Sequence, residues 1–260
     1  SWNTDFIFSK TKNEITDLKS HANVLSLISG NGFGREGYPV RGLFSIPFAG
    51  LTEDGLPTFI NQDGQKTISS FNFQEYEKLD FLKYEGPTDP TITGSFGNIL
   101  TYKNLKLNVF VTYSFGNVIR LDPVFSNAYS DLDAMPKEFK NRWMKAGDEN
   151  VTNIPTIVST RMNQQYAYLN MAYNAYNYSD VRIADGGFIR LKEISLSYDL
   201  PAKVINFFRL NKLQLKLQAT NLCLLYADSK LNGQDPEFFR SGGVSTPVPK
   251  QFTFTVRLGL

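Results

Sequence analysis

The sequence Gln251-Phe252-Thr253-Phe254-Thr255-Val256-Arg257-Leu258-Gly259-Leu260 alternates between two kinds of side chain at every step. Its even-numbered residues are all apolar, and its odd-numbered residues are glutamine, threonine, arginine and glycine. Successive side chains of a β-strand point to opposite faces, so this period of two predicts a strand with one apolar and one polar face.

The same alternation recurs along the chain and is longest in residues 105–116. There the apolar set is Leu105, Leu107, Val109, Val111, Tyr113 and Phe115, and the polar set is Lys106, Asn108, Thr112, Ser114 and Gly116, with Phe110 as the exception. The pattern predicts further strands over residues 2–9, 91–102, 194–200 and 212–220, and a seventh, where the alternation is least regular, over 14–20.

The connections between these strands alternate in length. Three are short (9–13, 103–104 and 201–211), and three are long (21–90, 119–187 and 227–249). Outer-membrane β-barrels alternate short periplasmic turns with long extracellular loops. The predicted fold class is therefore all-β: strands of a large antiparallel transmembrane β-barrel with long extracellular loops.

Seven strands do not complete such a barrel. Bacterial single-chain barrels have an even number of strands, and an open sheet would leave unpaired backbone groups at its edges in lipid. We therefore expect residues 1–260 to be a portion of a β-barrel domain that strands outside this sequence complete. The apolar residues are odd-numbered before Lys192-Glu193 (Ile189 and Leu191) and even-numbered after it (Ile194 and Leu196). This change predicts either a β-bulge or the point where that strand leaves the bilayer.

Composition narrows the class of protein. Hydrophobic residues make up 42% of the chain and charged residues 20%, which argues against a disordered chain. The net charge of +2, without a long Lys/Arg run, argues against a nucleic-acid partner. Aromatic residues reach 14%, a bias shared by soluble β-rich proteins and the aromatic belts of membrane barrels.

No catalytic, cofactor-binding or metal-binding residue is predicted. Cys223 and His21 are single, so an intrachain disulfide and a closed Cys/His zinc site are excluded. A triad on His21 lacks a nucleophile motif, since no G-x-S-x-G is present. Residues 32–37 match the dinucleotide-binding pattern G-x-G-x-x-G, but no strong strand precedes them and Pro39 follows where a helix should begin.

The long loops contain three features that could bind a metal, a partner or a ligand. Four acidic residues, whose spacing fits no calcium loop, are interpreted as solvated: Asp131, Asp133, Asp148 and Glu149. Residues 136–146 predict a short helix, with Pro136 in its first turn and Phe139 and Trp143 on one face. The stretch from Asn163 to Tyr178 is rich in tyrosines and amides, which suit contact with sugars or peptides, although packing within the loop is the simpler explanation. The substrate-binding residues stay unknown.

Several segments resemble SusC/RagA-type TonB-dependent outer-membrane transporters, and they follow the family's order over residues 36–260. They are Glu36-Gly37-Tyr38-Pro39-Val40, Ala49-Gly50-Leu51, Asp54-Gly55-Leu56-Pro57, Asn61-Gln62-Asp63-Gly64, Asp89-Pro90-Thr91-Ile92-Thr93-Gly94-Ser95-Phe96, Arg142-Trp143 with Gly147-Asp148 and Ile154-Pro155, Gly187-Phe188-Ile189-Arg190-Leu191-Lys192, Leu196-Ser197-Tyr198 with Pro201, and Thr220-Asn221-Leu222. The final residue departs from many outer-membrane barrels, because it is Leu260 and not an aromatic residue.

This resemblance implies the C-terminal part of a plugged barrel of the 22-stranded type, with the plug and N-terminal strands outside residues 1–260. It further implies a bacterial outer-membrane location and import of oligosaccharides or oligopeptides. The implied partners are the remaining N-terminal part of the transporter, a SusD-type surface lipoprotein, TonB through that missing part, outer-membrane lipid, and a glycan or peptide ligand. No enzymatic activity is expected.

Two other classes compete with this interpretation. The first alternative is a soluble β-sandwich that binds carbohydrate, and the second is an all-β hydrolase. A sandwich packs the apolar faces of two sheets against each other, whereas a barrel turns them outward to lipid. The direction of the apolar faces therefore separates the alternatives.

Overall fold

The computed structural model describes residues 1–260 apart from 30–33, 131, 208–209, 240–246 and 260. The chain forms two compact units. The first contains residues 1–11, 90–117 and 185–260, and the second contains residues 12–89 and 118–184. Both units are therefore assembled from segments that are far apart in the sequence.

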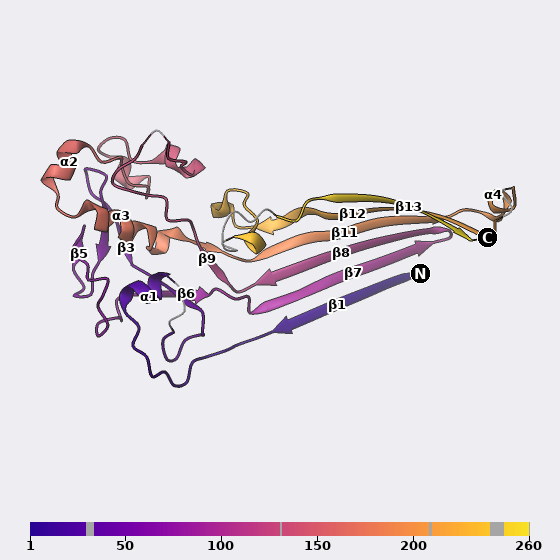
Figure 1. Cartoon of the computed structure of the whole chain (residues 1–260), viewed down its shortest axis with the longest axis horizontal. Coiled ribbons are helices and arrows are strands. Elements are labelled where there is room, and N and C mark those ends of the chain that lie inside the picture. Colours follow the sequence, from indigo (N-terminus) through magenta and orange to yellow (C-terminus); the bar gives the residue numbers. More distant parts are fainter. Residues whose placement is uncertain (30–33, 131, 208–209, 240–246, 260) are drawn as a thin grey trace. The chain divides into compact units, whose positions relative to one another are not determined.

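The first unit is built on one antiparallel sheet of six strands in the order β1-β7-β8-β11-β12-β13 (Figure 1). The strands are β1 (Trp2–Lys10), β7 (Ile92–Tyr102), β8 (Leu105–Phe115), β11 (Phe188–Asp199), β12 (Lys212–Ala227) and β13 (Gln251–Gly259). A short helix, α4 (Ala202–Phe207), lies between β11 and β12, and two 3-10 turns, η4 (Ser229–Leu231) and η5 (Pro236–Phe238), follow β12. Six of the seven predicted strands are confirmed. Leu260 lies outside the described residues.

The predicted strand over residues 14–20 is wrong. Ile15 instead makes local backbone hydrogen bonds, donating to Tyr38 O and accepting from Gly37 N, each at 2.9 Å. Its side chain fills the space that Gly34 leaves, since a Cβ on Gly34 would lie 2.1 Å from Ile15 Cδ1. Residues 9–13 are therefore not a turn between two strands, and the argument from an odd strand count does not hold.

The parity change at Lys192-Glu193 is a β-bulge. The register of β11 shifts between Leu191 and Glu193 against both of its neighbours, β8 and β12. On β12 the irregularity falls at Asn221, which has a left-handed backbone with φ of 53°. The bulge lets β11 continue to Phe188 while its apolar side chains stay on one face.

The predicted long loops 21–90 and 119–187 fold together as the second unit. Its elements are α1 (Val24–Ser29), β2 (Gly42–Ser45), β3 (Phe48–Leu51), β4 (Pro57–Ile60), β5 (Lys66–Thr67), β6 (Lys83–Pro87), β9 (Val118–Arg120), η1 (Lys137–Asn141), η2 (Asp148–Asn150), α2 (Thr160–Gln165), α3 (Leu169–Asn177), η3 (Asp180–Arg182) and β10 (Ile183–Asp185). The small strands form the sheets β2-β6, β3-β4-β5 and β9-β10. The class is thus mostly β, with short helices confined to the connections.

Both segments contribute to the core of the second unit. Phe44 and Phe59 come from the first segment, and Tyr173 and Tyr176 come from the second. Arg120 is also buried there, and its guanidinium donates hydrogen bonds to the carbonyl oxygens of Phe44 and Ser179. The unit is therefore stabilised across the segment boundary both by apolar packing and by buried hydrogen bonds.

The helix predicted over residues 136–146 is wrong in extent. Only η1 forms, and Pro136 precedes it with extended backbone. The backbone turns extended at Arg142 because the next residue, Trp143, donates its N–H to Ile154 O at 2.9 Å. Trp143 also covers Gly55, where an added Cβ would lie 2.4 Å from the indole. Phe139 and Trp143 therefore do not share a helical face.

Among the described residues, no helix combines the length and the hydropathy that crossing a bilayer requires.

Candidate functional site

The alternation in the sequence becomes two continuous faces of the six-stranded sheet. Directly paired residues point to the same side of a sheet. The pairing register therefore places one apolar residue from each strand in a single row, namely Trp2, Leu100, Leu107, Leu196, Leu217 and Phe254. The neighbouring positions on every strand form the opposite, polar face.

The apolar face is the exposed one. On the strands that have neighbours on both sides, Leu217 is 59% exposed, and Phe96, Leu100 and Leu196 are exposed as well. The polar face, by contrast, holds residues that are buried, including Ser95, Ser114 and Ser195. This is the inverse of a soluble sheet, in which apolar burial drives folding. The described strands of this unit form one sheet, not two facing sheets, so the β-sandwich alternative is contradicted.

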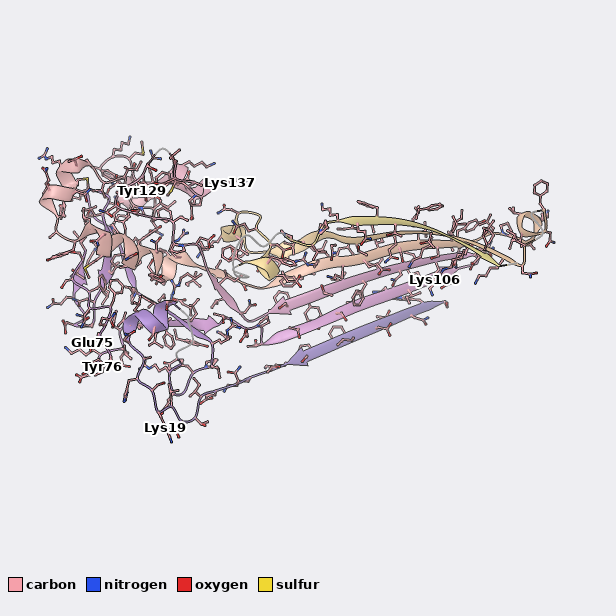
Figure 2. All side chains as sticks on the ribbon, viewed as in Figure 1. Lys19, Glu75, Tyr76, Lys106, Tyr129 and Lys137 are labelled. Carbon is pink, nitrogen blue, oxygen red and sulfur yellow. The ribbon has the colours of Figure 1, made fainter. Side chains whose placement is uncertain are left out.

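A row of hydrogen-bond donors crosses the polar face near its turn end. Thr101, Lys106, Ser197, Lys216 and Thr255 pair in that order across five strands. Arg257 lies one row further along, paired with Gln214. The predicted shared side of Lys106, Lys216 and Arg257 is confirmed, and Figure 2 labels Lys106 on β8. Within the described part of the chain, none of these three cations forms an ion pair.

Glu193 stands on the same face beside the β-bulge. Its Oε1 accepts hydrogen bonds from Asn108 Nδ2 at 3.1 Å and from Ser195 Oγ at 3.2 Å. Asn108 is therefore on the polar face, opposite in direction to Val109, as the alternation predicts. The carboxylate of Glu193 thus accepts hydrogen bonds from two neutral side chains on the polar face. One row of residues separates it from Lys106 and Lys216.

A buried ion-pair cluster, which sequence reasoning missed, lies towards the other end of β11. Arg190 Nη2 lies 2.6 and 2.7 Å from the two carboxylate oxygens of Asp235, and 3.1 Å from Glu237 Oε2. The Arg190 and Asp235 side chains are 6% and 9% exposed. The partners are 45 residues apart, so no local pattern could have linked them.

Local hydrogen bonds occupy Asp148 and Glu149, two of the acidic residues of the long loops. Asp148 accepts backbone hydrogen bonds from Met144 and Lys145, and Glu149 accepts from Gly147 N and Trp143 Nε1. Hydrogen bonds from its own backbone N–H and from the indole lower the pKa of Glu149. Asp131 lies outside the described residues, and no cluster of three or more metal-ligating side chains occurs within them.

The described part of the glycine pattern, residues 34–37, leads into a turn at Glu36-Gly37. Positions 32 and 33 lie outside the described residues, and Gly37 has a φ of 81°. The described chain that follows turns into the strand β2, without the helix that a pyrophosphate site needs.

The tyrosine and amide stretch divides into packed and exposed residues. Tyr173 and Tyr176 are buried in the core of the second unit, and burial raises the pKa of both phenols well above the ordinary value. Tyr166 donates a hydrogen bond to Asp54 Oδ2 at 2.9 Å. Tyr168 is 70% exposed, with a left-handed backbone at φ of 61°. Packing therefore accounts for the two buried tyrosines.

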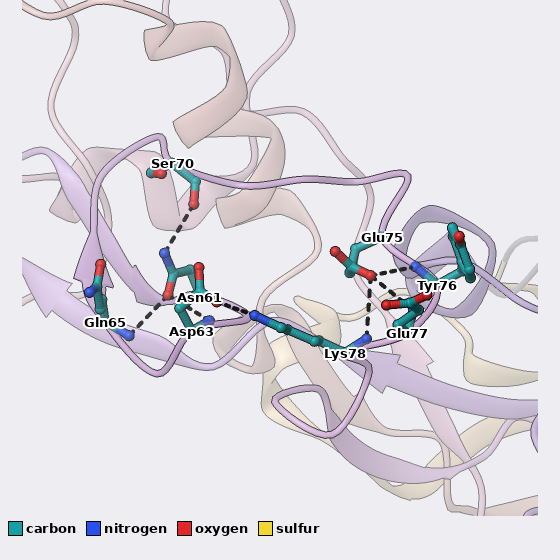
Figure 3. Close-up of polar contacts among 8 residues, drawn as sticks. All are labelled: Asn61, Asp63, Gln65, Ser70, Glu75, Tyr76, Glu77 and Lys78. Atoms are coloured by element: carbon teal, nitrogen blue, oxygen red, sulfur yellow. Dashed lines mark hydrogen bonds and ion pairs between the residues drawn. The ribbon is translucent and has the colours of Figure 1, made fainter.

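The segment Asn61-Gln62-Asp63-Gly64 forms a structural turn between β4 and β5 (Figure 3). Asn61 Oδ1 accepts hydrogen bonds from the backbone of Asp63 and Gln65, and Lys78 Nζ lies 2.7 Å from Asp63 Oδ1. Glu75 Oε1 accepts backbone N–H groups from the turn that leads to Lys78. These backbone hydrogen bonds lower the pKa of Glu75, and the Asp63 carboxylate raises the pKa of Lys78.

Known proteins resemble the chain in sequence and in fold. TonB-dependent receptor P3 from Formosa agariphila is 24% identical across 91% of this chain and 23% of its own length. A structure of the RagAB peptide transporter superposes with a TM-score of 0.69 and 22% identity, over 99% of this chain and 27% of that chain. The resemblance to SusC/RagA-type transporters is confirmed. No family model matches the chain.

RagAB has been solved in more than one state, and the chain resembles each. The "open-open" state of the RagAB peptide importer gives a TM-score of 0.68 at 21% identity, and the "closed-closed" state gives 0.67 at 22% identity. The chain spans about a quarter of the length of these relatives. They are named as receptors and transporters and not as enzymes, in agreement with the expectation that the chain has no enzymatic activity.

Proposed function

We propose that the chain is the C-terminal portion of the β-barrel domain of a TonB-dependent transporter in a bacterial outer membrane. The observation that carries this proposal is the exposed apolar face of the six-stranded sheet, backed by a polar face that holds buried serines. An apolar exterior and a polar interior are what lipid and an aqueous passage require. The resemblance to TonB-dependent proteins supports the same conclusion.

The barrel is closed, in this proposal, by strands from the rest of the transporter. In the described residues, β1 and β13 each have one neighbour in the sheet and are its two edges. Unpaired backbone groups at such edges are not tolerated in hydrocarbon. The N-terminal part supplies the missing strands, the plug and the contact with TonB.

We assign the direction of the strands from the lengths of their connections. The β7–β8 turn at Lys103-Asn104 and the connection through α4 are short, so they face the periplasm. The second unit and the segment after β12 then belong to the extracellular side. A SusD-type surface lipoprotein is the proposed partner there, because the solved relatives are RagAB complexes.

The proposed cargo is an oligopeptide or an oligosaccharide, and oligopeptides come first in testing because RagAB is described as a peptide importer. The unpaired lysines Lys106 and Lys216 give the polar face a positive row. Such a row attracts anionic groups. We therefore expect acidic ligands to be preferred over neutral ones of equal length.

The experiment uses the full-length transporter with its lipoprotein in bacterial cells. Uptake of fluorescent oligopeptides and oligosaccharides is measured with and without a protonophore that removes the energy for TonB. The proposal predicts outer-membrane localisation and uptake that stops with the protonophore. Recovery of the full-length protein in the soluble fraction contradicts it.

A further inference from the structure

The segment from Asp228 to Phe239, here called the strap, is a built structure on the first unit. Asp228 accepts a hydrogen bond from Asp185 N at 2.8 Å, which holds its start. Leu231 is 2% exposed. Asp235 caps η5 through Glu237 N and also pairs with Arg190. The strap therefore has fixed points at its beginning, middle and end, and Figure 1 shows it after β12 in gold.

The pairing register decides on which side of the sheet the strap lies. Arg190 pairs with Thr112, and Thr112 pairs with Ser95, on the polar face. The neighbouring row, with Leu191 and Val111, belongs to the apolar face. Because Asp235 of the strap forms an ion pair with Arg190, whose side chain is on the polar face, the strap lies over that face.

The chemistry of the contact indicates a positioning role. A buried ion pair adds little net stability compared with apolar packing of the same volume, but it fixes geometry. Here both oxygens of Asp235 meet one guanidinium nitrogen, with Glu237 as a second acid. Removing Arg190 leaves the buried Asp235 carboxylate without the cation that compensates its charge, so the contact favours the strap position in which the two groups meet.

We propose that Arg190 is a positioning residue that latches the strap against the polar face, so that the strap narrows the passage lined by that face. The inference rests on the proposed function, since the passage exists only in a closed barrel. The ligand class it acts on is the proposed cargo of the transporter, and the strap limits the size of the cargo that passes.

The test compares three variants of the full-length transporter with its lipoprotein. Arg190→Met removes the ion pairs to both Asp235 and Glu237, whereas Asp235→Asn removes only the first and leaves Glu237 Oε2 3.1 Å from Arg190. Lys192→Met is the matched control, because it removes a positive charge from the same strand at a residue with no ion pair among those the structure describes. Hydrogen exchange of residues 229–239 reports on the strap, and uptake of a graded series of fluorescent oligopeptides reports on the passage.

The latch predicts that amide exchange in the strap is more than tenfold faster in Arg190→Met, with a smaller increase in Asp235→Asn because the Glu237 pair remains. Arg190→Met should also take up longer peptides than the parent does. Lys192→Met should match the parent in both measurements. Heat-modifiable gel mobility shows whether each variant is folded.

Two results overturn the inference. Unchanged exchange in the folded single variants means that Arg190 does not hold the strap, and faster exchange with an unchanged size limit means that the strap does not narrow the passage. A parent that takes up no ligand overturns the transport proposal instead, and the exchange result then still decides whether the latch exists.

Discussion

Replacing Val109 with arginine tests the direction of the sheet. Val109 is the fifth of the eleven residues of β8, and it pairs with Asn98 and Ile194 on the apolar face. A strand of 9–11 residues crosses a bilayer, which puts Val109 near the midplane. Arginine on the lipid face at that depth costs about 2–4 kcal/mol, equivalent to roughly a 30- to 1000-fold shift in the folding equilibrium.

The adjacent substitution Asn108→Arg is the matched control. Asn108 points to the polar face and donates to Glu193 Oε1 at 3.1 Å. An arginine there keeps a donor beside the Glu193 carboxylate and meets no hydrocarbon, so we expect the barrel to fold.

The assay is heat-modifiable gel mobility of the full-length transporter in outer-membrane fractions. Val109→Arg should strongly reduce the folded band, and Asn108→Arg should preserve it. Equal tolerance of the two substitutions would refute the assignment of β8 as a membrane strand, because it would show that both faces meet the same environment.

Three further predictions concern the connections. Protease added to intact cells should cut within residues 12–89, 118–184 or 228–250, or be blocked by bound lipoprotein; labelling of residues 200–211 from outside would contradict the proposed orientation. Gly55→Ala should destabilise the second unit by more than Gly64→Ala, because both glycines have left-handed backbones but only Gly55 lies under Trp143. In both variants the strain of a left-handed alanine lowers the free energy of unfolding by about 1–2 kcal/mol. In Gly55→Ala the clash with Trp143 lowers it by about 1–3 kcal/mol more. Thermal unfolding measures both losses, and equal losses would count against the Trp143 contact. The pKa of Glu75 is lowered by backbone hydrogen bonds, so its contribution to the turn is present above the ordinary value of 4.5 and is lost as the pH falls through the lowered pKa. The hydrogen-exchange protection factors of the amides of residues 76–78 should fall in that acidic range. In Glu75→Gln they should no longer depend on pH there.

Local patterns in the sequence predicted the sheet but not the second unit. The alternation in 105–116 and 251–260 can be recognised within a single strand, because the two faces of a strand meet different surroundings and each residue belongs to one face. The edge-to-face packing of Phe48 on Tyr176 joins residues that are far apart in the sequence, so the segments that hold them have no local pattern of a folded unit and were predicted as loops. The end of β12 was missed because Asn221 breaks the alternation at the bulge.

The interleaved construction of the second unit has a consequence for folding kinetics. Phe48 N donates a hydrogen bond to Asp180 across 132 residues, and the hairpin of β7 and β8 lies between the two halves in the sequence. Closure of such a distant contact is entropically slow, and proteins dominated by such contacts fold slowly. Until both segments are in place, Phe44 and Phe59 lack their core partners from the second segment, and their exposed apolar surface favours aggregation.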